Sequence, residues 1–229
     1  MTDPPELAID LGPDLGRVSA LLVRPPDAWL LYVLAHGAGA GMRHRFLESI
    51  AGALARHGVA TLRYQFPYME RGARRPDPPS VAEATVRAAV GLAEEAAPGL
   101  PLIAGGKSFG GRMTSGAVAK SLPGVRGIVF LGFPLHPPGQ PGTRRADHLD
   151  EIDLPMLFLQ GTRDVFAQHD LITAVCGRLG SRATLHLVGE ADHSFGIPKR
   201  SGRPASSVFD ELADTLVQWA RAGVTGKAR

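Results

Sequence analysis

The chain has 229 residues, 44% of them hydrophobic and 21% charged, which suits one domain with a large buried core. Its formal net charge of +3 is too small to indicate a nucleic-acid-binding protein. The single cysteine, Cys176, excludes an intramolecular disulfide and a thiolate metal cluster, and we expect a buried, unreactive thiol.

Strand-like and helix-like segments alternate along the chain. Short apolar runs predict strands at 18–23, 29–35, 59–64, 101–105, 126–132, 155–160 and 183–188. Helical periodicity follows at 43–57, 80–96, 109–121, 166–179 and 206–222. Ser80 and Glu83 form a capping-box pattern, and Gly58 follows the end of another helix. The alternation predicts an α/β domain with a parallel sheet, over residues 1–229.

No apolar run reaches the length of a membrane span, and the N-terminal residues do not resemble a secretory leader. We therefore expect a cytoplasmic protein that binds neither membranes nor nucleic acid. No residue pattern calls for a metal or another cofactor, so we expect none. Nothing in the sequence indicates the oligomeric state.

The most informative motif is Gly-Lys-Ser-Phe-Gly at 106–110, where an apolar run ends and a helix-compatible stretch begins. A strand that turns sharply into a helix would present the Ser108 hydroxyl at a strained elbow, with glycines leaving room on either side. A phosphate-binding loop would need a glycine five residues before Gly106, where the chain has Pro101. We interpret Ser108 as a candidate nucleophile.

A nucleophilic serine needs a base, and the base needs an acid to orient it; in this type of sheet the chain order is serine, acid, histidine. His193 follows the last predicted strand and is the candidate base, although an ordinary exposed loop histidine would fit the same place. Asp164 follows the preceding strand and is the candidate acid. Asp192 is its rival but fits a turn better, and Asp170 falls in a predicted helix.

Acyl transfer also needs backbone donors for the oxyanion. One is usually the N–H of the residue after the nucleophile, here Phe109. The other should come from His-Gly-Ala-Gly-Ala-Gly at 36–41, whose small residues let the backbone approach a carbonyl group; Ala38 is the first choice. The alternative for this segment is a flexible turn before a helix.

Four of these motifs, taken in chain order, resemble the α/β-hydrolase superfamily; they lie at 36–39, 106–110, 161–164 and 192–195. The resemblance covers the chain from about Ala20 to Ala220. It implies the α/β-hydrolase fold: a mostly parallel, twisted sheet of seven to eight strands, with helices on both faces and an acyl-transfer site at the carboxyl edge.

The segment Phe-Pro-Tyr-Met-Glu-Arg-Gly at 66–72 is similar to one in a lidless dienelactone-hydrolase-like branch of that superfamily. One relative in this branch is a subunit of the NSL chromatin acetylation complex. Dienelactone hydrolase itself has a cysteine nucleophile, so its lactone specificity does not carry over to Ser108. The short connection between the strands at 126–132 and 155–160 leaves no room for a large cap domain.

The resemblance implies a serine hydrolase of the carboxylesterase or thioesterase type that acts on a small-molecule ester. Ser108 would form the acyl-enzyme, His193 would be the general base and Asp164 the orienting acid. The alternative is a non-catalytic or weakly catalytic binding or scaffold protein with the same fold.

Two arginine pairs follow predicted strands. Arg74 and Arg75 lie after the strand at 59–64, and Arg144 and Arg145 after the strand at 126–132. Either pair would suit a carboxylate or phosphate group of the substrate, with Arg74 and Arg75 as the candidate contacts. Solvated loop arginines are the alternative in a chain this rich in arginine.

Overall fold

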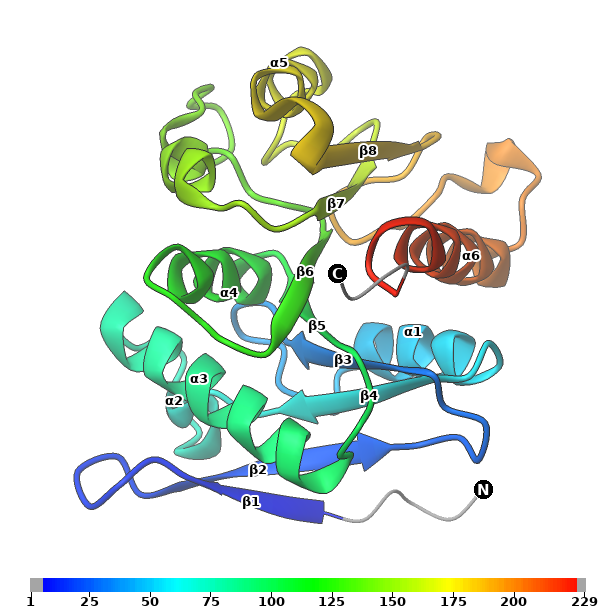
Figure 1. Ribbon diagram of the computed structural model, residues 1–229. Helices are drawn as coiled ribbons and strands as arrows, with labels where there is room; N and C mark the ends of the chain where they lie inside the picture. The colour runs from blue at the N-terminus through cyan, green and yellow to red at the C-terminus, as the bar shows by residue number, and fades with distance from the viewer. Residues whose placement is uncertain (1–5, 226–229) are drawn as a thin grey trace.

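A computed structural model describes residues 6–225, so the ends of the expected 1–229 domain lie outside the described residues. Within this range one sheet of eight strands forms the centre of the molecule (Figure 1). The strand order is β1-β2-β4-β3-β5-β6-β7-β8. The strands are β1 (Glu6–Asp10), β2 (Arg17–Val23), β3 (Leu30–Ala35), β4 (Val59–Tyr64), β5 (Leu102–Lys107), β6 (Val125–Leu131), β7 (Met156–Gly161) and β8 (Ala183–Val188).

The sheet is mixed but mostly parallel, as the sequence predicts. β1 pairs antiparallel with β2, and β2 antiparallel with β4, whereas all pairs from β4 through β3 to β8 are parallel. The seven strands expected from apolar runs are all present. β1 is the strand that these runs did not predict, because it lies at the sheet edge and only Ile9 among its residues is buried.

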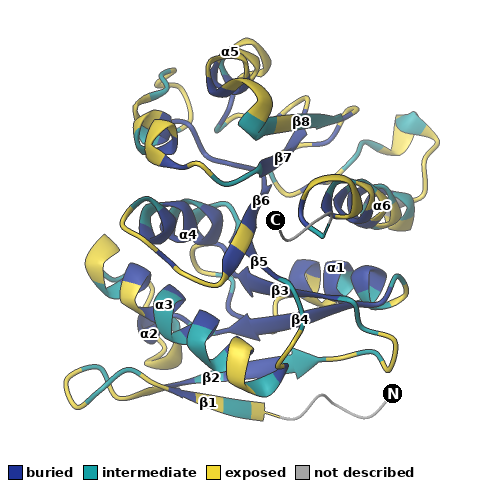
Figure 2. Cartoon of the chain, viewed as in Figure 1, coloured by how far each residue is buried: buried dark blue, intermediate teal, exposed yellow. Residues whose placement is uncertain are grey.

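Helices cover both faces of the sheet (Figure 1). α1 (Arg45–Ala55) and α6 (Ala205–Gly223) lie on one face, and α3 (Pro79–Ala96), α4 (Phe109–Ala119) and α5 (His169–Leu179) on the other. Alternate residues of the strands belong to two hydrophobic clusters, one on each face of the sheet. In β3, Leu31 and Val33 belong to one cluster, and Leu30 and Leu34 belong to the other. Figure 2 shows the central strands buried and the outer helix surfaces exposed, as a parallel sheet covered on both faces requires.

Shorter helical turns occupy segments for which the sequence predicted neither a strand nor a helix. They are α2 (Pro67–Glu70) and the 3-10 helices η1 (Arg144–Glu151), η2 (Gly180–Arg182) and η3 (Lys199–Ser201). The connection from β6 to β7 holds only η1, which confirms that no cap domain is inserted there. This connection therefore places no large insertion over the carboxyl edge of the sheet.

The predicted capping box is wrong. α3 begins at Pro79, one residue before Ser80, and no side chain caps it. Proline suits the first turn of a helix because the missing N–H would have no partner there. The largely buried Glu83 carboxylate instead pairs with Lys120, at the end of α4, at 2.8 Å. Gly58 does follow the end of α1, with a φ of +70°.

Two expectations from composition can be compared with the structure. Cys176 is buried on α5, as expected. Burial raises the pKa of its thiol to about 12, which disfavours the reactive thiolate. Over residues 6–225, none of the helices combines the length and the apolar character that crossing a membrane requires.

Candidate active site

Ser108 lies at the junction of β5 and α4, at the carboxyl edge of the sheet. Its backbone has φ 49° and ψ −111°, a region that non-glycine residues disfavour. Hydrogen bonds hold it there: its N–H donates to Leu131 O at 3.2 Å, and its carbonyl accepts from Arg112 N at 3.1 Å. The chain thus forms the strained elbow expected from the sequence.

Glycines on either side of Ser108 allow the elbow to pack against β3. A Cβ at Gly106 would lie 2.3 Å from Ala35 O, and one at Gly110 would lie 2.6 Å from His36 O. Both distances are far below van der Waals contact with backbone atoms that cannot easily move. The two glycines therefore allow the elbow to lie close to the end of β3, in addition to allowing the sharp turn.

The three residues predicted to act together are in hydrogen-bonding contact. His193 Nε2 lies 2.8 Å from Ser108 Oγ, and His193 Nδ1 lies 2.7 Å from Asp164 Oδ2. A carboxylate can only accept, so Nδ1–H is the donor to Asp164, and Nε2 of the neutral ring is free to accept the Ser108 proton. These residues follow β5, β7 and β8, which bring them to one edge from distant positions in the chain.

Further hydrogen bonds hold the buried Asp164 carboxylate. Phe166 N donates to Oδ1 at 2.8 Å, and Gln160 Nε2 donates to Oδ2 at 2.5 Å. The Gln160 Oε1 in turn accepts from Phe133 N at 2.9 Å. Gln160 is fully buried on β7 and was not identified from the sequence, although a lone amide in an apolar strand was the available signal.

Asp192 forms the turn that was expected of it. Its Oδ1 accepts from the N–H groups of Ser194 and Gly196 at 2.8 and 2.9 Å, so the carboxylate closes the loop that carries His193. Asp170 lies exposed in the first turn of α5. Of the three aspartates considered, only Asp164 contacts the imidazole of His193.

The loop after β3 is organised by His36, whose role the sequence did not reveal. Phe66 N donates to Nε2 at 3.1 Å, so Nδ1–H must be the donor to Gly37 O at 2.7 Å. Burial lowers the pKa of His36 to about 4, against the opposing effect of the Gly37 bond, so the ring is neutral at pH 7.

This arrangement orients the Ala38 N–H. Gly37 O accepts from His36 and also from Ala40 N at 3.2 Å. In a trans peptide the next N–H points away from the carbonyl, so the Ala38 N–H points away from His36. Ala38 lines the cavity beside Ser108. Phe109 begins α4, so its N–H has no intrahelical acceptor, while its ring packs edge-on against Phe66 at 5.3 Å.

A cavity of about 340 Å³ opens beside Ser108 and His193. Its walls include Phe46 and Leu47 of α1, and Phe166, whose ring lies 4.3 Å from that of His193. This size is near the lower end of the range for small-molecule sites. The cavity therefore suits a small, partly apolar ligand.

Arg74 and Arg75 are exposed and do not line this cavity. The segment that carries them folds back on itself, because Arg71 pairs with Asp77 at 2.7 Å and Tyr68 N donates to the same carboxylate at 2.7 Å. The geometry gives no support to the prediction that these two arginines contact the substrate.

Lys107, just before the elbow, has a buried Nζ without a hydrogen-bond partner within residues 6–225. The ammonium lies 6.0 Å from the centre of the Phe46 ring and 5.7 Å from that of Phe195. Burial lowers the pKa of Lys107 to about 8, and the charges of Asp164 and Asp192 offset part of this effect. Keeping this lysine charged therefore costs stability.

Replacing Lys107 with methionine should stabilise the protein at neutral pH. The pKa of this lysine is about 8 in the folded protein, below the ordinary value of 10.5 that it regains on unfolding. Between these values the unfolded chain binds more protons, so the free energy of unfolding rises with pH. The shift corresponds to a cost of about 3 kcal/mol below this pH range. Lys107→Met should remove this cost at pH 7 and flatten the rise. Urea unfolding at pH 7 and pH 10 measures both effects.

Lys199→Met provides the matched control, because Lys199 is exposed. It should leave the free energy of unfolding and its pH dependence unchanged. Identical behaviour of the two variants would contradict the cost assigned to the buried ammonium.

No group of three or more His, Cys, Asp or Glu side chains within residues 6–225 is arranged to hold a metal ion. The polar groups next to Ser108 are instead donors and acceptors of protons. A hydroxyl, an imidazole and a carboxylate in sequence can move a proton away from the hydroxyl as its oxygen forms a new bond.

Comparison with known proteins places the chain in a family. A family model described as an alpha/beta hydrolase domain matches residues 28–221. Similar solved structures include a serine hydrolase without lid from Xanthomonas campestris (19% identity, TM-score 0.73, covering 99% of this chain and 98% of that one). A dienelactone hydrolase from Anabaena variabilis is similar at 19% identity and a TM-score of 0.74, covering 97% of this chain and 99% of that one. The esterase domain of a Rhodothermus marinus protein is similar at 19% identity and a TM-score of 0.71, covering 96% of this chain and 98% of that one. These identities are low, so the likeness concerns the fold. Since the family match spans most of its length, the chain belongs to the α/β-hydrolase family.

Proposed function

We propose that the protein is a serine hydrolase that cleaves a carboxylic ester or thioester through an acyl-enzyme on Ser108. The observation that carries this proposal is the hydrogen-bonded series Ser108–His193–Asp164 beside a cavity of about 340 Å³. The strained backbone of Ser108 supports it, since residues held in disfavoured backbone conformations cluster at functional sites.

The proposed reaction has two stages. His193 Nε2 removes the Ser108 proton while Oγ attacks the carbonyl carbon, and the oxyanion is stabilised by the N–H groups of Ala38 and Phe109. Asp164 stabilises the imidazolium, which then gives its proton to the departing alkoxide or thiolate. In the second stage water attacks the acyl carbon while His193 accepts its proton. His193 then returns that proton to Ser108 Oγ as the bond to the acyl carbon breaks, which releases the carboxylic acid and restores the free hydroxyl.

The walls of the cavity favour a small acyl group. Phe46, Leu47 and Phe166 supply apolar contacts, and no cap domain lies between β6 and β7 to enclose a long chain. We therefore expect short-chain esters to be turned over faster than long-chain esters. The leaving group, on the open side, should be weakly selected.

A series of p-nitrophenyl esters from acetate to octanoate tests the proposal, with Ser108→Ala as the control. The wild-type protein should release p-nitrophenol with highest kcat/KM for the shortest acyl groups, and Ser108→Ala should be inactive. Turnover that survives Ser108→Ala would refute the assignment. No turnover by the folded wild type would favour the non-catalytic scaffold, an alternative that rests on the resemblance to the branch containing an NSL-complex subunit.

Gln160 is proposed as a positioning residue for Asp164. Gln160→Leu removes the donor to Asp164 Oδ2 and leaves Phe133 N without its acceptor. The loss of such buried hydrogen-bond partners should lower the free energy of unfolding by about 1–3 kcal/mol. We also expect kcat to fall about tenfold, because the imidazole loses its fixed orientation. Urea unfolding and ester kinetics measure the two effects.

The exposed Gln218 of α6 offers the comparison, since Gln218→Leu makes the same chemical change far from the site. It should leave both quantities near the wild-type values. A Gln160→Leu protein with full kcat would show that Asp164 is held without the amide.

A further inference from the structure

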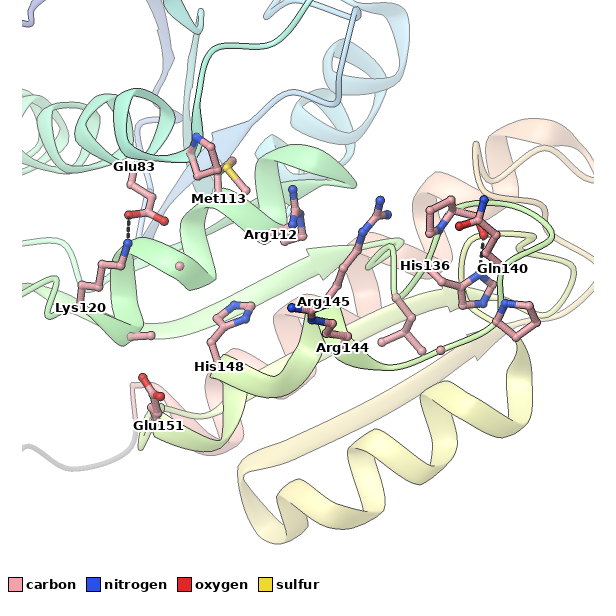
Figure 3. Close-up of a pocket in the computed structure, with 17 residues that line it drawn as sticks. Glu83, Arg112, Met113, Lys120, His136, Gln140, Arg144, Arg145, His148 and Glu151 are labelled. Carbon is pink, nitrogen blue, oxygen red and sulfur yellow. Dashed lines mark hydrogen bonds and ion pairs between the residues drawn. The ribbon is translucent and has the colours of Figure 1, made fainter.

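A second, larger cavity of about 830 Å³ lies between α4, the segment after β6 and η1 (Figure 3). It shares no lining residue with the cavity at Ser108. We call it the arginine cavity, after Arg112 of α4 and Arg144 and Arg145 of η1. Its volume lies well within the range of small-molecule sites.

The three arginines that line it form no ion pair with any carboxylate of the described chain. No carboxylate in residues 6–225 pairs with them, whereas Arg56 pairs with Asp210 and Arg178 with Asp150. Arg112 is partly buried, and its pKa is lowered first by burial and then by the charge of Arg145. An anion between these groups would offset the cost of burying the Arg112 charge and would weaken the repulsion between Arg112 and Arg145.

His136 adds a buried polar atom to the same cavity. The residue is 3% exposed, and its Nε2 has no hydrogen-bond partner within the described chain. Its Nδ1 lies 2.8 Å from Pro137 O, so Nδ1–H is the donor. Nε2 is then an acceptor in the neutral ring and a donor in the imidazolium. A group that carries both an O–H and anionic oxygens would satisfy Nε2 in either state.

The opposite end of the cavity has a different character (Figure 3). There Lys120 and Glu83 form an ion pair at 2.8 Å, so their charges balance each other. Met113 and Leu135 supply apolar surface elsewhere in the cavity. His148 is fixed by a contact of 2.8 Å between its Nε2 and Ser115 Oγ. A ligand that fills the space would therefore carry its charge at the arginines and extend its organic body toward the Lys120–Glu83 pair at the C-terminal end of α4.

We propose that the arginine cavity binds a phosphorylated small molecule, with the phosphate monoester held by Arg112, Arg145 and His136 and with Arg144 at the rim. A monoester carries a charge of about −1.5 to −2 at pH 7 and three terminal oxygens, which match several guanidinium groups. Its second pKa is about 6, so a P–OH or P–O⁻ group is available to His136. A simple carboxylate has less charge and no such hydroxyl.

Calorimetric titration with phenyl phosphate, at fixed pH and low ionic strength, tests this proposal. The double variant Arg112→Gln/Arg145→Gln should raise the Kd by about tenfold or more, since each loses charge-assisted hydrogen bonds. Arg74→Gln/Arg75→Gln makes the same change in net charge on exposed residues and should leave the Kd within about twofold. Lys107→Met should also leave it unchanged, because Lys107 lines the other cavity. Benzoate, a simple carboxylate of similar size with less charge, should bind more weakly than phenyl phosphate.

A second measurement needs only the wild-type protein. Phenylglyoxal modifies arginine side chains, and peptide mass analysis locates the adducts. Phenyl phosphate should protect Arg112 and Arg145 at least about tenfold more than Arg74 and Arg75 if it sits between the first two. The proposal is overturned if phenyl phosphate does not bind saturably, if both double variants weaken it equally, or if Lys107→Met abolishes binding. Uniform protection of all four arginines would also overturn it.

Discussion

His193→Ala is expected to lower kcat/KM for a p-nitrophenyl ester by a factor of roughly 10⁴ to 10⁶. The hydroxyl of Ser108 is a weak nucleophile at neutral pH unless a base accepts its proton. His193 Nε2, at 2.8 Å from Oγ, is the imidazole nitrogen in position to do so. Steady-state kinetics of the purified variant measure the loss, which belongs to kcat if the substrate still enters the cavity.

The double variant Ser108→Ala/His193→Ala sharpens this prediction. Residues that act as one unit give non-additive losses, so the double variant should be no slower than the slower single variant. His169→Ala is the matched control, because His169 is exposed at the start of α5. It should keep wild-type kinetics. Losses that multiply in the double variant would contradict a shared mechanism.

Gly106→Ala is expected to destabilise the protein by at least about 3 kcal/mol, and in practice to prevent accumulation of folded protein. The new Cβ would lie 2.3 Å from Ala35 O, and φ at this position is +155°. Either β5 or β3 would have to move, which would also displace Ser108. Urea unfolding, or the yield of folded protein, measures the effect.

Gly91→Ala is the contrasting variant, because Gly91 lies inside α3 with nothing within 4 Å of its added Cβ. Alanine there should raise the free energy of unfolding by about 0.5–1 kcal/mol, since it reduces the entropy of the unfolded chain. If both glycine variants were equally stable, the close packing of the elbow on β3 would be wrong.

The sequence predicted the fold well because buried parallel strands are continuous apolar runs. Strands with one buried face carry a weaker signal, and β1, with only Ile9 buried, was not found. Short elements such as α2 and η1 were not predicted either, because they are too short to show a clear helical periodicity. The capping box failed because Pro79 began the helix one residue before Ser80.

The sequence predicted the part of the candidate site that follows from the order of the strands. Strand order places Ser108, Asp164 and His193 at one edge of a parallel sheet, so their meeting could be expected from chain order. The partners of Gln160 and His36 are the backbone N–H groups of Phe133 and Phe66, at distant positions in the chain. Sequence patterns do not record such pairings, which become visible only in the folded structure.

The nucleophilic role of Ser108 is tested most directly by the mass of the intact protein after treatment with a fluorophosphonate, which reacts with activated serine hydroxyls. The wild type should gain one adduct per chain, located by peptide mass analysis on Ser108, and Ser108→Ala should gain none. A folded wild-type protein that remains unlabelled, or a Ser108→Ala variant that is labelled equally, would contradict the proposal that Ser108 is an activated nucleophile.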